Sequence, residues 1–263
     1  MHRMFLESHS ETTCTYEQYR TVFATNFNLG FGRPKTDVCA VCEGKKNLIE
    51  ATTDEDRKKE IITELINHTQ EAEKFYQLLN KKQEDGVLTV CFDLMQNQVL
   101  PKTPIGDAYY SRQIYQYFLG VVRHRKEDLN KHDLRFYTWG EYQSARGANE
   151  IASAVVHYLP TNLTETTTVV KLFCDACPGQ NRNFTMVAML SAFSAIHKIP
   201  ASMHFSVRGH SNKYSGICPQ DRAFGRVEQS LCRCTTLMVP NDYYKHFSNV
   251  GEVIQLLDAG LTD

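Results

Sequence analysis

The sequence lacks three features that would assign it at once to a broad class of protein. No apolar run approaches the roughly 20 residues that a membrane-spanning helix needs. The first residues, Met1 to Glu7, have no apolar core of the kind found in secretory signals. The formal net charge is only −1, so any contact with DNA must come from local patches. We therefore expect an intracellular protein without a membrane segment.

A disulfide framework is also not expected. The chain has nine cysteines, an odd number, and no secretory segment. Free thiols in a reducing compartment, with a metal site among them, fit these counts better. With 42% hydrophobic and 22% charged residues, the 263-residue chain can bury a normal core. Its length allows one large domain, or a domain with a small appendage.

The first third of the chain has the pattern of helices. Aromatic residues recur at helical spacing from Tyr16 to Phe27. A charged helix is expected from Thr53, its cap, to Gln83. The pattern changes after Gly86, so we predict a helical segment over residues 1–86 and a second domain over residues 87–263.

Cys39-x-x-Cys42 is half of a zinc site, because two thiolates at this spacing can bind one tetrahedral ion from a tight turn. His68, on the charged helix, is a candidate third ligand. Cys14 and His9 are candidates for the fourth position. The alternatives are two buried thiols or a redox pair. A zinc ion here would be structural and would hold the N-terminal helices together.

From Val87 onward, short apolar runs alternate with helical patterns. The expected strands cover residues 87–94, 109–122, 134–139, 166–175 and 203–207. The expected helices cover residues 147–159, ending before Pro160, residues 181–197, a segment from Pro219, and residues 250–257. An antiparallel meander followed by β-α-β crossovers is the order of a ribonuclease H-like core. We therefore predict an α/β fold with a mixed sheet.

Four acidic residues fall where this fold would bring them to one crevice. The first and fourth strands would be neighbours, which brings Asp93 and Asp175 together. Asp221 and Glu228 are seven positions apart on one helix face, and either or both could add a carboxylate. Carboxylates held close together raise one another's pKa, and a pair of Mg²⁺ or Mn²⁺ ions would relieve that cost. The alternative role for Asp175 is to cap the next helix.

Five basic residues are candidates for contacts with nucleic-acid phosphates. They are Arg112, Arg146, Arg182, Arg208 and His210. A guanidinium group binds phosphate in a bidentate manner, whereas ion pairing within the protein is the alternative for each arginine. For His210, metal binding and loop bracing are both alternatives.

The order of short motifs resembles that of a known group of proteins. The motifs are Asp37-Val38-Cys39-Ala40-Val41-Cys42, Phe92-Asp93-Leu94, Tyr137-Thr138-Trp139-Gly140-Glu141, Asp175-Ala176-Cys177-Pro178-Gly179-Gln180-Asn181, Arg208-Gly209-His210-Ser211 and Asp221-Arg222-Ala223-Phe224-Gly225. The chain resembles, from about Phe27 to Glu228, transposon-derived proteins of unknown function that recur in animal genomes. In that family a Cys-Asp pair usually follows Gly-His-Ser directly. Here Asn212 to Gln220 intervene, so the third acid stays open between Asp221 and Glu228.

The resemblance implies an RNase H-like transposase or integrase domain of the DDE/D type. Its expected activity is metal-dependent phosphoryl transfer on DNA, in which water cleaves the strand or a 3′-hydroxyl group joins it to a target. Asp93, Asp175 and Glu228 or Asp221 would bind the two metal ions. A non-catalytic, domesticated relic that binds nucleic acid or protein is the alternative, and an unrelated nuclease is a third. DNA is the expected partner and the nucleus the expected location; a homo-oligomer stays open.

Overall fold

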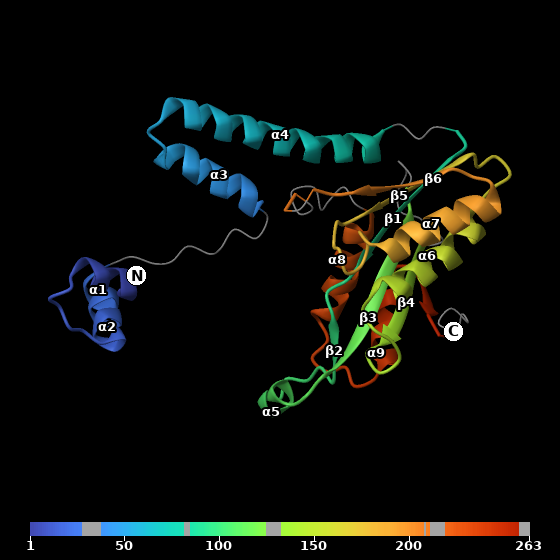
Figure 1. Cartoon of the computed structure of the whole chain (residues 1–263). Coiled ribbons are helices and arrows are strands. Elements are labelled where there is room, and N and C mark those ends of the chain that lie inside the picture. The colour runs from blue at the N-terminus through green and yellow to red at the C-terminus, as the bar shows by residue number, and fades with distance from the viewer. Residues whose placement is uncertain (28–37, 82–84, 125–132, 208, 211–218, 258–263) are drawn as a thin grey trace. The chain divides into compact units, whose positions relative to one another are not determined.

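The computed structural model describes residues 1–27, 38–81, 85–124, 133–207, 209–210 and 219–257 (Figure 1). The chain divides into two units, Met1–Thr36 and Asp37–Asp263. The predicted boundary at residues 86 and 87 falls inside the second unit, where it marks the change from helices to sheet. A separate domain over residues 1–86 stays a prediction. Across the described ranges, no helix is both long and apolar enough to span a membrane.

The first unit contains helices α1 (His2–Ser8) and α2 (Tyr16–Asn26). A capping box begins α2, because the Thr15 hydroxyl accepts a hydrogen bond from the Gln18 backbone and the Gln18 side chain accepts one from the Thr15 backbone. The expected aromatic face joins the helices, with the Phe5 and Tyr19 rings 5.4 Å apart between centroids.

The second unit is a mixed α/β structure built on a seven-stranded sheet. Its strands are β1 (Val87–Leu94), β2 (Gln98–Leu100), β3 (Ile114–Arg123), β4 (Leu134–Gly140), β5 (Val169–Cys174), β6 (Ala201–Phe205) and β7 (Glu252–Gln255). The strand order is β6-β5-β1-β3-β4-β7, and β2 pairs with β3. The predicted meander is confirmed, since β1, β3 and β4 pair antiparallel. The predicted neighbours β1 and β5 pair in parallel.

Helices cover both faces of this sheet (Figure 1). The described helices of the second unit are α3 (Ala40–Ala51), α4 (Glu55–Asn80), α5 (Gly106–Tyr110), α6 (Ala148–Asn162), α7 (Phe184–His197), α8 (Pro219–Leu231) and α9 (Pro240–Ser248). One core lies between the sheet and α6 and α7, and includes the buried Trp139. The second core lies between the sheet and α8, α9 and the last turns of α4. Buried apolar strands covered on both faces account for the near-continuous apolar runs in the sequence.

The predicted helix over residues 250–257 is wrong. The structure instead has α9 and then the strand β7, which pairs in parallel with β4. Pro240 begins α9, where a missing backbone N–H costs nothing. Gly251 follows that helix, and the β-branched Val253 and Ile254 fit a sheet edge better than a helix.

Two helix boundaries and the presence of one helix also differ from expectation. Helix α6 continues through Pro160 instead of ending before it. Proline has no backbone N–H, so the Val156 carbonyl loses its helical donor; Val156 is an exposed residue. Helix α4 begins after Asp54, not Thr53, since the Asp54 side chain accepts hydrogen bonds from the backbone N–H groups of the first turn. Helix α3 was not expected, because the thiol spacing was interpreted as a tight turn.

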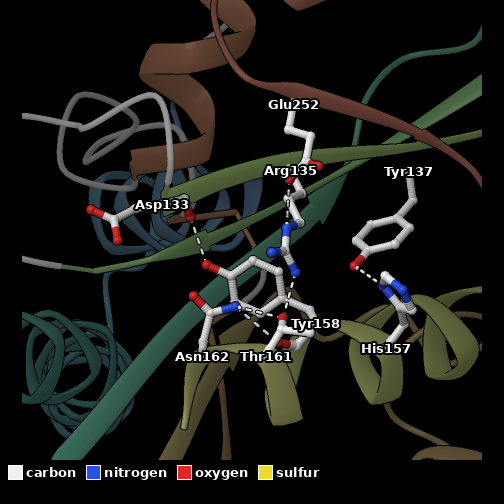
Figure 2. A network of polar contacts seen from close by, with 8 residues as sticks. All are labelled: Asp133, Arg135, Tyr137, His157, Tyr158, Thr161, Asn162 and Glu252. Carbon is white, nitrogen blue, oxygen red and sulfur yellow. Dashed lines mark hydrogen bonds and ion pairs between the residues drawn. The ribbon is translucent and has the colours of Figure 1, made fainter. Parts of the chain in front are cut away.

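A polar network connects β4, α6 and the edge strand β7 (Figure 2). Arg135 Nε donates to Glu252 Oε2 at 2.8 Å, and its guanidinium group also donates to Thr161. The same guanidinium lies 5.3 Å from the centre of the Tyr158 ring. Tyr158 in turn donates its hydroxyl to the backbone oxygen of Asp133 at 2.6 Å. These contacts connect β7 to β4 and α6.

Candidate active site and metal centre

The sheet register brings Asp93 and Asp175 to the same place. Strands β1 and β5 pair in parallel, with Cys91 opposite Phe173. Asp93 and Asp175 lie two residues further along, so they are level with one another. Side chains alternate between the faces of a strand, so both acids share the face of Cys91 and Phe173. That face is covered by α8.

All four predicted acids line one cavity of about 430 Å³. Asp221 belongs to the first turn of α8, and Glu228 lies two turns further along the same helix. Asp93, Asp175 and Asp221 are partly buried, whereas Glu228 is exposed. Much of the remaining wall is apolar and includes Phe224 of α8. The cavity therefore holds several carboxylates beside apolar surface.

Burial and mutual repulsion both disfavour the charged forms of these acids. Burial, followed by the negative charges of Asp175 and Asp221, raises the pKa of Asp93 to about 7. The Leu94 backbone N–H, 2.9 Å from Asp93 Oδ1, and the charge of Arg146 act in the opposite direction. Burial raises the pKa of Asp221 to about 6. Of the two candidates for the third acid, Asp221 is the one whose charge acts on Asp93.

Asp175 is held in place by the turn that follows β5. Its Oδ1 accepts hydrogen bonds from the Asn181 side chain and, at 3.3 Å, from the Cys177 backbone. The next helix, α7, is capped by Asn183, whose Oδ1 accepts from Met186 N at 3.1 Å. The alternative in which Asp175 caps that helix is therefore wrong.

The predicted phosphate-binding residues lie in different surroundings. Arg112 is exposed and pairs with Glu141 at 3.2 Å. Arg146 and Arg182 are exposed, and Arg146 acts electrostatically on Asp93. Arg208 lies outside the described residues. None of the three described arginines is among the residues that line the acidic cavity.

Two buried amide side chains also belong to this site: Asn181, for which the sequence allows a sugar-phosphate contact or a role in the turn, and Gln220, which was not predicted as a functional group. Gln220 lines the cavity, and its Oε1 has no hydrogen-bond partner within the described part of the chain. The Oδ1 atom of Asn181 is likewise buried and unpaired there, while its amide nitrogen holds Asp175. For Gln220 the sequence carries only a weak signal, namely its position directly before Asp221, whereas Asn181 belongs to the motif that begins at Asp175.

A second group of candidate metal ligands lies where α3 and α4 meet the segment after β6. Cys39, Cys42, His68 and His210 place their ligand atoms within 4.8 Å of one another. Cys39 Sγ is 3.3 Å from His68 Nε2, and Cys42 Sγ is 3.2 Å from His210 Nε2. The cluster could bind a metal ion such as zinc. Among the described residues, it is the one group of at least three such ligands that comes together in this way.

His210 occupies the position for which Cys14 and His9 were the candidates. His210 is 4% exposed and its Nε2 atom lies against the Cys42 thiol, so its ring faces the cluster. Cys14 instead lies beside His2 in the first unit, with Cys14 Sγ 3.8 Å from His2 Nε2. Sequence spacing could not identify His210, because it follows β6, far along the chain from the two thiols.

The local backbone brings these four ligands together. Cys39 is the N-cap of α3, Cys42 lies in its first turn, and His68 belongs to α4. Gly209 has a φ of +84°, and a Cβ atom there would lie 2.8 Å from Cys39 Sγ. Glycine is therefore required for the close approach of the two segments. Burial, followed by the neighbouring Cys39, raises the pKa of the Cys42 thiol.

Comparisons with known proteins give little further information. No protein-family model matches the chain, and no curated protein matches it. Among solved structures, the chain is similar to the crystal structure of the Mos1 strand transfer complex, with a TM-score of 0.39 and 10% sequence identity. The match covers 94% of this chain and 82% of that chain. A similarity of this size does not assign a function.

Proposed function

We propose that the second unit is an RNase H-like domain that catalyses metal-dependent phosphoryl transfer on DNA. The observation that carries this proposal is the arrangement of Asp93, Asp175 and Asp221 around one cavity at the carboxyl ends of β1 and β5. Ligand sites of open α/β sheets lie at such strand ends. The strand order, with an antiparallel meander followed by parallel crossovers, is the one expected of that fold.

The residues of the cavity fit hard divalent cations. Mg²⁺ and Mn²⁺ bind carboxylate and carbonyl oxygens, which Asp93, Asp175, Asp221 and Gln220 all offer. The pKa of Asp93 is raised by burial and then by the negative charges of Asp175 and Asp221, and nearby cations would compensate those charges. Among the described residues, the acids do not converge as closely as the ligands of the Cys/His cluster. When bound, two such ions activate a water or 3′-hydroxyl nucleophile and stabilise the departing oxygen.

The protein groups would position the ions and the DNA strand. Asn181 fixes the orientation of Asp175 through its amide hydrogen bond. Asp221 is the preferred third acid, since its charge reaches Asp93 and its carboxylate is partly buried. Glu228, exposed at the same cavity, is placed to act at the rim. Arg146, whose charge acts on Asp93, would meet a phosphate approaching the acids. A DNA substrate implies that the protein works in the nucleus.

Strand cleavage tests the proposal directly. We expect purified protein to cleave labelled DNA with Mg²⁺ or Mn²⁺ and not without them. Asp93→Asn and Asp175→Asn should reduce cleavage to the level without enzyme, because each removes a ligand charge. Glu165→Gln, which alters an exposed acid in the turn before β5, should have no effect. A larger loss from Asp221→Asn than from Glu228→Gln would support Asp221 as the third acid.

A measurement of metal binding distinguishes the enzymatic proposal from the non-catalytic alternative. Titration with Mn²⁺, followed by electron paramagnetic resonance, should show binding that Asp93→Asn weakens strongly and Glu165→Gln does not. If the wild-type protein binds no divalent ion at this cavity, the enzymatic proposal is wrong. Binding without cleavage or joining of any DNA would instead indicate a non-catalytic relic.

A further inference from the structure

The distances within the Cys/His cluster match a tetrahedral metal site. Zinc–sulfur bonds of about 2.3 Å and zinc–nitrogen bonds of about 2.0 Å place sulfur and nitrogen roughly 3.5 Å apart at a tetrahedral angle. The two closest sulfur–nitrogen distances in the cluster are 3.3 Å and 3.2 Å. All ligand atoms lie within 4.8 Å of one another, so a single ion can contact the four of them after small adjustments.

Another Cys–His contact in the same unit shows what a simple pair looks like. Cys234 Sγ lies 3.4 Å from His246 Nε2, and the other ring nitrogen of His246 lies 2.7 Å from the Ser230 hydroxyl. A thiol–imidazole hydrogen bond accounts for that pair. Among the described residues, no third cysteine, histidine or acidic side chain joins it to form a metal-binding group. The cluster at Cys39 instead contains two adjacent Cys–His pairs, and the centroids of the His68 and His210 rings are 4.8 Å apart.

The ligand set also indicates which metal would bind. Two thiols and two imidazoles in a tetrahedral arrangement favour zinc over magnesium or calcium, which prefer oxygen. Cys39 and His210 are buried, and the other two ligands are partly buried. Four protein ligands leave no open position for a substrate, as is typical of structural zinc sites.

We propose that Cys39, Cys42, His68 and His210 bind one zinc ion, and that this ion fixes the segment after β6 to helices α3 and α4. Three separate segments of the second unit then meet at one point. The proposal does not depend on the DNA chemistry inferred for the acidic cavity.

The zinc site would also support one wall of the acidic cavity, an inference that rests on the proposed function. The hydroxyl of Tyr76 donates a buried hydrogen bond to the backbone oxygen of His210 at 2.8 Å. Tyr76 lines the acidic cavity, as does Ser206, which precedes His210 by four residues. His68 and Tyr76 both belong to α4, about two turns apart. The ion and the cavity thus share a helix and the segment after β6.

Metal analysis of the purified full chain tests the zinc site. We expect one zinc per chain, and a cobalt-substituted protein with the visible absorption of a tetrahedral thiolate site. Cys42→Ser and His210→Ala should lose the metal, whereas His210→Cys, which restores a ligand, should retain it. Cys234→Ser is the matched control and should keep full zinc content.

Other outcomes would overturn the proposal. Absence of zinc from freshly purified protein, or full zinc content in folded Cys42→Ser, would show that the cluster is not a metal site. A disulfide between Cys39 and Cys42 in protein purified without reductant would indicate a redox pair instead. Circular dichroism of each variant distinguishes loss of metal from loss of fold, and His210→Cys keeps the test valid if His210→Ala does not fold.

The link to the acidic cavity needs its own measurement. Tyr76→Phe removes the hydrogen bond to His210 while keeping the ring, so zinc content should not change. Mn²⁺ binding at the acidic cavity should weaken, by up to about tenfold if the hydrogen bond holds the wall in place. Unchanged Mn²⁺ affinity in Tyr76→Phe and in zinc-free protein would exclude the link and leave the zinc site intact. Absence of Mn²⁺ binding in every form would instead contradict the proposed function.

Discussion

The acidic cavity and the Cys/His cluster are two ligand sets built on opposite principles. The cavity gathers hard carboxylate oxygens of the sheet ends and α8 around a space of about 430 Å³. The cluster gathers soft thiols and imidazoles from α3, α4 and the segment after β6, with four ligands and no open position. An open site of weakly held ions suits exchange with substrate, whereas a closed site suits permanent attachment.

The two sites also differ in how charge is balanced. Without cations, burial and then repulsion by Asp175 and Asp221 raise the pKa of Asp93 to about 7. In the cluster, two thiolates would neutralise one zinc ion, and the neutral imidazoles add no charge. Metal removal should therefore leave uncompensated negative charge at the acids. At the cluster, it should remove the ion that joins α3, α4 and the segment after β6. Three experiments would break or sharpen this comparison.

The largest effect is expected from the pH dependence of stability. The pKa of Asp93 lies above its ordinary value of 3.8, so the folded state binds more protons than the unfolded state between about pH 4 and pH 7. Without divalent ions, stability should fall across this range as pH rises, by roughly 4 kcal/mol at most. Asp221, with a pKa of about 6, adds to the same trend. Urea unfolding from pH 4 to pH 8 measures it.

The matching variant isolates the contribution of Asp93. Asp93→Asn should flatten the curve and make the protein more stable than wild type above pH 7, while saturating Mg²⁺ should do the same for wild type. The cluster contributes the opposite slope, because protons compete with zinc for its ligands at low pH. A wild-type minus Asp93→Asn difference that does not change with pH would show that neither burial nor the neighbouring acids raise the pKa of Asp93.

A smaller effect is expected at the cluster. Gly209→Ala forces a side chain into a left-handed backbone conformation and against the Cys39 sulfur. We expect a loss of about 1–3 kcal/mol in unfolding free energy and weaker zinc retention against a chelator. Gly106→Ala, where a Cβ atom meets nothing within 4 Å, is the control. Normal stability and zinc retention in Gly209→Ala would mean that His210 reaches the cluster without this close approach.

The smallest effect is expected where α8 lies on the sheet. Gly120 is opposite Asp93 in the register of β1 and β3, and a Cβ atom there would lie 2.9 Å from the Phe224 ring. Gly120→Ala should lower stability by about 1–2 kcal/mol and weaken Mn²⁺ binding, since α8 must shift and Asp221 moves with it. Zinc content should not change. Adding Phe224→Leu should restore part of the stability; if it does not, crowding against α8 is not the cause.

Much of the fold could be predicted because local patterns and long-range packing agree there. The strands near Asp93 and Asp175 are short apolar runs, and a sheet covered on both faces needs such runs. The prediction failed at residues 250–257, where β7 exists because an edge of β4 is available for pairing. Such pairing is a property of the assembled sheet and leaves little trace in four residues.

The candidate sites were predictable to different degrees. Strand order alone placed Asp93 beside Asp175, because parallel neighbours end at the same edge of the sheet. Helical spacing could not decide between Asp221 and Glu228, since both point to the same cavity and only their depth differs. Metal binding was one alternative for His210, but the sequence could not connect it to Cys39 and Cys42, because the partners of these thiols depend on where β6 ends.

The distance along the chain between Cys42 and His210 has a consequence for the order of folding. These residues are 168 positions apart, and β1 to β6 lie between them. Cys39, Cys42 and His68 lie on two consecutive helices and can meet early, when only a short loop must close. His210 can join only after β6 has added to β5, so full zinc affinity would arise as the sheet is completed. Tight zinc retention would therefore report that β6 has paired with β5 and that the segment carrying His210 has reached α3 and α4.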